Sequence, residues 1–173
     1  KDAMQAAHAR SPVCLYDMEE VMAESIFSVK PENLFNQEEP LDIGFVPIYI
    51  LTNQDKLNGA SVSAQEGVLE KVAELLGTNY YVLPSSIHEL LILPDNGSMQ
   101  LSELEAMVRE VNATQVAPED RLSDKVQYYD RETKLLQRGQ EKSVLGRLSD
   151  KKAQLQQADH TAPKQPHRSE VSL

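Results

Sequence analysis

The segment from Leu83 to Glu89 holds the side chains best suited to covalent chemistry. It reads Leu-Pro-Ser-Ser-Ile-His-Glu and lies between two apolar runs. On an extended chain Ser86 and His88 share one face, because they are two residues apart, whereas Glu89 points to the other face. A serine and a histidine can act as nucleophile and base if an acid orients the histidine and an oxyanion hole is present. The candidate catalytic residues of a small hydrolase or transferase are therefore Ser86, His88 and Glu89.

The same residues have a structural interpretation, which we favour. Serine hydroxyls at positions 85 and 86 would satisfy backbone groups at a turn, and His88 would hydrogen-bond to a neighbouring strand or loop. Polar residues also follow an apolar run at Asn53 and Asn58, and loops at strand ends often carry binding groups. The candidate ligand-binding residues are Asn53, Asn58 and Ser85, although Asn58-Gly59 is most simply a turn.

Metal and cofactor chemistry find little support in the sequence. None of the four histidines stands at zinc-site spacing from another histidine, a cysteine or a carboxylate on one element. The glycines are isolated rather than clustered into a phosphate-binding loop. We therefore predict no metal and no cofactor. The single cysteine, Cys14, is predicted to be a small buried hydrophobe, in agreement with a reducing compartment.

The charge distribution argues against nucleic acid and anionic membranes as partners. The formal net charge is −10; residues 1–138 hold 11 Lys/Arg and 23 Asp/Glu (−12), whereas residues 139–173 hold six and four (+2). Phosphate-rich partners are bound mainly through Lys and Arg, so the acidic body would repel them. The chain has no run of about 20 apolar residues and no signal-peptide pattern at its start. We expect a cytoplasmic protein, with a protein partner as the remaining class of macromolecular ligand.

Hydrophobic periodicity predicts an α+β fold: a small, mainly antiparallel sheet with two or more amphipathic helices packed on it. The expected helices cover residues 18–26, capped by Asp17, residues 63–76, with a capping box from Ser63 to Glu66 and a stop at Gly77, and residues 101–111. The expected strands cover residues 45–51, 80–83 and 87–93, followed by a hairpin at 126–136 that competes with a helix over 122–136. Residues 1–138 would form one domain, and residues 139–173 a flexible polar tail.

The sequence resembles an uncharacterised family of Gram-positive gut bacteria. The resemblance rests on the Leu-Pro-Ser-Ser-Ile-His-Glu string at 83–89, on the surrounding residues 48–95, and on residues 107–112 and 122–130. It covers residues 1–136, and longer members carry an additional N-terminal region. The resemblance implies no activity, ligand or catalytic set. We therefore expect a non-catalytic accessory or protein-interaction domain, with a hydrolase or transferase using Ser86 and His88 as the alternative.

Overall fold

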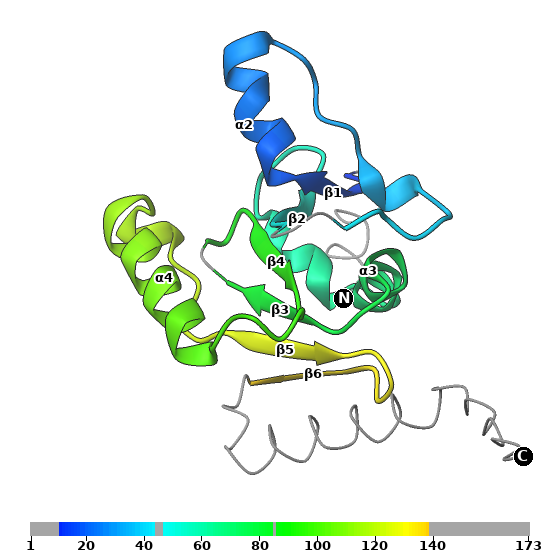
Figure 1. The fold of residues 1–173 in the computed structure, drawn as a ribbon. Helices are drawn as coiled ribbons and strands as arrows, with labels where there is room; N and C mark the ends of the chain where they lie inside the picture. Colours follow the sequence, from blue (N-terminus) through cyan, green and yellow to red (C-terminus); the bar gives the residue numbers. More distant parts are fainter. Residues whose placement is uncertain (1–10, 44–46, 85, 139–173) are drawn as a thin grey trace, which may run out of the picture. The chain divides into compact units, whose positions relative to one another are not determined.

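A six-stranded antiparallel sheet forms the centre of the protein. The computed structural model describes residues 11–43, 47–84 and 86–138. The strands are β1 (Val13–Asp17), β2 (Tyr49–Asn53), β3 (Tyr80–Leu83), β4 (Leu90–Pro94), β5 (Gln127–Asp130) and β6 (Leu135–Arg138). Their order in the sheet is β1-β2-β4-β3-β5-β6, and every neighbouring pair is antiparallel (Figure 1). The predicted α+β fold with an antiparallel sheet is confirmed.

The two faces of the sheet are covered by different helices. Helix α3 (Val68–Leu76) packs on one face and α4 (Leu101–Thr114) on the other (Figure 1). Successive side chains of β3 point to opposite faces of the sheet, so this strand contributes to the core on each side. Tyr80 and Val82 pack on the α3 side, and Tyr81 and Leu83 pack on the α4 side. The central strands are therefore apolar on both faces.

Helix α3 follows the predicted apolar stripe but begins later than predicted. Val68, Val72, Leu75 and Leu76 are buried, and Gly77 ends the helix in the left-handed conformation. The capping box at Ser63 is wrong. Residues Gly59–Ala64 form a 3-10 helix, η2, in which the Ser63 hydroxyl donates to the Ala60 carbonyl. Helix α3 begins only after Gly67, so Ser63 lies too far from its first turn to cap it.

Several predicted strand boundaries are corrected by the structure. Residues 45 and 46 of the run predicted at 45–51 lie outside the described residues, and β2 begins at Tyr49; the run predicted at 87–93 forms β4 from Leu90. Ile87 does not enter the strand, because its N–H donates to the Asp120 carbonyl and its own carbonyl accepts from Ala60. The hairpin of β5 and β6 is confirmed over the alternative helix. Strand β1 was not predicted.

The outer edge of β1 is covered by a side chain. The Asn33 amide oxygen accepts the Leu15 N–H at 3.0 Å, and its nitrogen donates to the Val13 carbonyl at 3.2 Å. Asn33 lies just before the short η1 (Leu34–Asn36) and so replaces a neighbouring strand over these two residues. This contact returns the chain to the sheet after helix α2 (Met18–Phe27).

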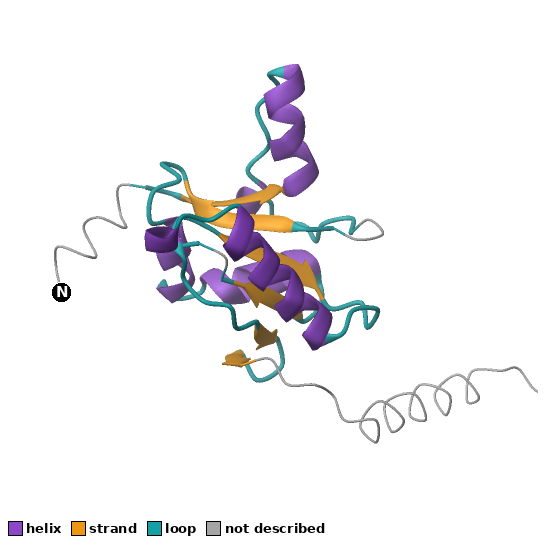
Figure 2. Cartoon of the chain, turned by 90° about the vertical axis from the view of Figure 1, so that its left-hand side faces the viewer, coloured by secondary structure: helices purple, strands orange, loops and turns teal. Residues whose placement is uncertain are grey.

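Helix α2 begins directly at the end of β1. The carboxylate of Asp17 accepts from the amides of Glu19 and Glu20, which confirms the predicted cap. The N–H of Met18 donates to the Ile48 carbonyl at 2.9 Å, so the first turn is tied to the sheet. From there the helix projects away from the strands (Figures 1 and 2).

The predicted tail at 139–173 lies outside the described residues. Among the helices of the described part of the chain, none combines the length and the apolar character needed to cross a membrane.

Candidate functional site

The candidate catalytic residues 86, 88 and 89 lie in a bend that precedes β4 rather than in the strand itself. The predicted shared face of Ser86 and His88 is wrong, because these residues are not in β4. The Ser86 hydroxyl oxygen accepts the backbone N–H of His88 at 3.0 Å, and Ser86 forms an isolated β-bridge with Arg121. The serine is buried and the histidine ring is about one-third exposed.

The His88 ring lies between two loops that are distant in the sequence. Its Nδ1 accepts the backbone N–H of Asn58 at 3.2 Å, and its Nε2 lies 3.4 Å from an Asp120 carboxylate oxygen. Because Nδ1 accepts a hydrogen bond, the neutral ring carries its proton on Nε2, facing Asp120. The ring thus joins the loop after β2 to η3 (Pro118–Asp120). Sequence reasoning missed Asp120, which has no distinguishing spacing from His88.

The backbone of His88 is held as closely as its ring. Its carbonyl accepts the hydroxyl of the fully buried Thr52 at 2.8 Å. Gly59 packs against this bond, since a Cβ placed there would lie 2.1 Å from Thr52 Oγ1 and 2.3 Å from the His88 oxygen. The close approach requires glycine at position 59.

The predicted ligand-binding residues are used in local contacts. The Asn53 side chain accepts the Leu57 N–H at 3.1 Å and donates to the Leu57 carbonyl at 2.9 Å, which closes the loop after β2. Asn58 adopts the left-handed conformation at the start of η2, and its exposed side chain makes no hydrogen bond within the described residues. Glu89 is partly buried and lies just before β4. Ser85 lies outside the described residues.

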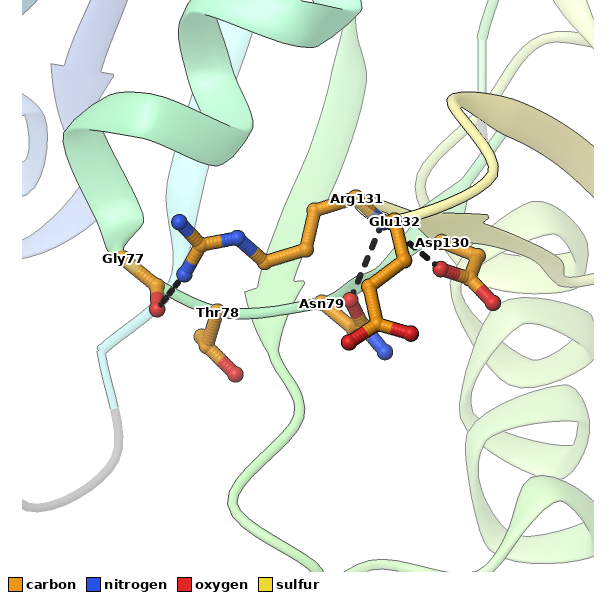
Figure 3. Close-up of a pocket in the computed structure, with 6 residues that line it drawn as sticks. All are labelled: Gly77, Thr78, Asn79, Asp130, Arg131 and Glu132. Atoms are coloured by element: carbon orange, nitrogen blue, oxygen red, sulfur yellow. Dashed lines mark hydrogen bonds between the residues drawn. The ribbon is translucent and has the colours of Figure 1, made fainter.

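A polar pocket of about 620 Å³ lies between the end of α3 and the β5–β6 turn (Figure 3). The Arg131 guanidinium donates to the Gly77 carbonyl, and the Arg131 N–H donates to the Asn79 side-chain oxygen at 3.0 Å. A cation is favourable at this carbonyl because it belongs to the negative end of the helix dipole. Asp130 accepts the N–H groups of Glu132 and Thr133 within its own turn. These polar groups mainly fasten the hairpin to α3.

Helix α2 exposes a group of large apolar side chains. None of its residues is buried, and Met22, Ile26 and Phe27 are 65%, 75% and 71% exposed. Val29, just beyond the helix, is 65% exposed. Met22 and Ile26 are one turn apart and lie on the same side of the helix. We call these four residues the α2 surface. The sequence showed the helical spacing of Met22 and Ile26, but it did not show that they face away from the sheet.

The described residues offer little for metal binding or thiol chemistry. No three His, Cys, Asp or Glu side chains within the described ranges gather in a way that could hold a metal ion. Cys14 is buried and has a free thiol, as predicted for its burial. Its sulfur accepts from the Asn33 amide at 3.4 Å.

The described residues form an α+β domain built on one antiparallel sheet. A family model described as a family of unknown function (DUF5688) matches residues 1–131, so the chain belongs to that family. No curated protein and no solved structure matches the chain significantly.

Proposed function

We propose that this chain is a non-catalytic protein-interaction domain that presents the α2 surface to an apolar groove rimmed by Lys and Arg on a protein partner. The observation that carries the proposal is a ten-residue helix with no buried residue and three large apolar side chains that are 65–75% exposed. Contiguous exposed apolar surface on a folded domain commonly marks a protein contact.

The short length of α2 and its exposed apolar side chains support a stabilising contact with a partner. Isolated helices shorter than about 12–15 residues are marginal in water, and most helices gain their stability from packing of an apolar face. The first turn of α2 is held by the cap at Asp17, by the Met18 N–H and by the Glu20 carboxylate, which accepts the Glu32 N–H. Ile26 and Phe27, near its far end, are exposed. The helix also ends at Ser28 in the left-handed conformation, which a non-glycine residue adopts at a cost. A partner that buries Ile26 and Phe27 would supply the stabilisation that the sheet does not.

The charge of α2 indicates the chemistry of the partner. The helix carries Glu19, Glu20 and Glu24 and no basic residue. Charged groups at the rim of an interface favour partners of complementary charge and speed their association. An apolar groove with a basic rim therefore fits the α2 surface better than a neutral or acidic one.

The proposal is tested with a panel of two-helix hairpin peptides that share one apolar groove between their helices and differ in the charge of its flanks. We expect the peptides whose groove is flanked by Lys and Arg to bind most tightly. Burying one Ile is worth about 1.5–3 kcal/mol, so Ile26→Asp should weaken binding roughly 10- to 100-fold. The matched control is Leu135→Asp, which adds the same charge at a 55% exposed leucine on β6, at the opposite edge of the sheet. Equal loss in the two variants, or no preference for basic flanks, would refute the proposal.

A hydrolase or transferase using Ser86 and His88 is the competing proposal. It is favoured by the Asp120 carboxylate, which lies opposite His88 Nε2. A carboxylate in this position can orient a histidine that acts as a catalytic base. The enzyme hypothesis expects Ser86→Ala to abolish turnover of an ester substrate while the melting temperature stays unchanged. The structural role that we propose expects a lowered melting temperature, because the serine oxygen accepts the His88 N–H.

We also propose that the protein acts in the cytoplasm of a Gram-positive gut bacterium. The single cysteine supports a reducing compartment, and the 83–89 string supports the source.

A further inference from the structure

A cavity of about 450 Å³ lies at the β1 edge of the sheet. Its lining comes from three separate segments: Cys14 and Tyr16 on β1, Glu24 and Lys30 at the end of α2 and beyond, and Lys56 in the loop after β2. Small-molecule sites in proteins commonly occupy about 300–1,000 Å³. The cavity is therefore large enough for a metabolite, and none of the four residues of the α2 surface and none of the residues 86–88 lines it.

The two lysines of this cavity differ from most cations of the protein. The described residues include nine Lys and Arg side chains, and six of them contact a protein oxygen: Lys71, Arg109, Arg121, Lys125, Arg131 and Lys134. Lys30, Lys56 and Arg138 have no such partner among the described residues, and the first two line the same cavity. In a body with a large excess of carboxylates, two lysines that line one cavity and form no ion pair with the described residues indicate a place for an anionic group from outside.

The remaining polar groups of the cavity restrict the ligand further. Glu24 lines the cavity and forms no ion pair with the described residues, so its carboxylate is available for a cation. Burial, mainly, raises the pKa of Tyr16 to about 12, so its phenol stays protonated and can donate a hydrogen bond near neutral pH. The Lys56 nitrogen lies 5.7 Å from the centre of the Tyr16 ring, so this cation lies over an aromatic ring that also lines the cavity.

We propose that this cavity binds a free α-amino acid, with the ligand carboxylate at Lys30 and Lys56 and its ammonium group at Glu24. A simple anion would leave Glu24 as a like charge beside it, and a simple cation would face two lysines. A zwitterion satisfies all three charged side chains. The cavity volume leaves room for the ligand side chain against Cys14 and the Tyr16 ring.

The test is calorimetric titration of the full 173-residue chain with each of the twenty common amino acids at millimolar concentrations, with propionate and propylamine as probes carrying one charge each. We expect at least one amino acid to bind and both single-charge probes to bind more weakly. Hydrogen bonds to charged groups are worth roughly a tenfold change in affinity or more. Lys30→Met, Lys56→Met and Glu24→Gln should each weaken binding by that factor.

The matched control is Arg138→Met, which removes the third unpaired cation at a residue that does not line the cavity. This change should leave the affinity unaltered. The unliganded melting temperature of Lys30→Met should equal that of the wild type, because Lys30 forms no ion pair with the described residues. Lys56→Met loses the contact with the Tyr16 ring, so its melting temperature should fall slightly, and a cooperative melting transition verifies that both variants are folded. The proposal is overturned if no amino acid binds, if propionate binds as tightly, or if Lys56→Met and Arg138→Met have equal effects. None of these results depends on the α2 surface.

Discussion

The contact between Gly59 and the turn at His88 gives the sharpest test of the structure. In Gly59→Ala the new Cβ would meet Thr52 Oγ1 at 2.1 Å, the His88 oxygen at 2.3 Å and the Asn53 nitrogen at 2.9 Å. Two of these atoms belong to the backbone and cannot rotate away. Overpacking of this kind costs about 1–3 kcal/mol. Breaking the buried hydrogen bond from Thr52 adds about 1 kcal/mol. We expect a total destabilisation of about 2–4 kcal/mol.

The control for this change is Gly97→Ala. Gly97 has a positive φ of 75° but no atom within 4 Å of the new Cβ, so it measures backbone strain without a clash. That strain costs about 1–2 kcal/mol. The assay is urea denaturation of both variants, compared through their midpoints with the m value of the wild type. If Gly59→Ala were no more destabilising than Gly97→Ala, the proposed packing of the β2 loop on His88 would be refuted.

Three further predictions concern the core, the tyrosines and α2. Leu75→Ala should cost about 2–5 kcal/mol because the side chain is buried, whereas Leu69→Ala on the partly exposed side of α3 should cost less; equal shifts in the urea midpoint would reverse the two faces. The pKa of each of the six tyrosines is raised, mainly by burial. Protonated tyrosines therefore contribute stability to the fold that is fully present below about pH 10, and this contribution is lost as the pH rises through the raised pKa values of the folded state. An absorbance titration at alkaline pH should therefore show ionisation together with unfolding, and independent ionisation of a folded protein would contradict this. Asp17→Ala removes a cap worth about 1 kcal/mol from a helix that contributes no buried residue. Hydrogen exchange should accelerate within α2 while the global urea midpoint stays constant, and a shifted midpoint would show that α2 is part of the cooperative core.

Elements whose signal is local could be predicted from the amino-acid sequence. The stripe of Val68, Val72 and Leu76, ended by Gly77, defined α3 because spacing on a helix and the left-handed glycine depend on neighbouring residues alone. The apolar run at Tyr80–Leu83 and the cap at Asp17 were found for the same reason. The resemblance over residues 1–136 was also a property of the sequence; the family model matches residues 1–131, and that family has no known function.

Tertiary structure alone decided which residues meet. The turn at 86–88 lost its predicted strand because Ile87 pairs with Asp120 and Ala60, partners that no periodicity reveals. The cavity at Cys14 is assembled from three segments, since antiparallel pairing places β1 beside β2, many residues later in the chain. The sequence likewise did not predict that Ile26 points away from the sheet. An amphipathic pattern identifies the apolar side of a helix, but it does not show whether that side contacts the sheet, a partner or water.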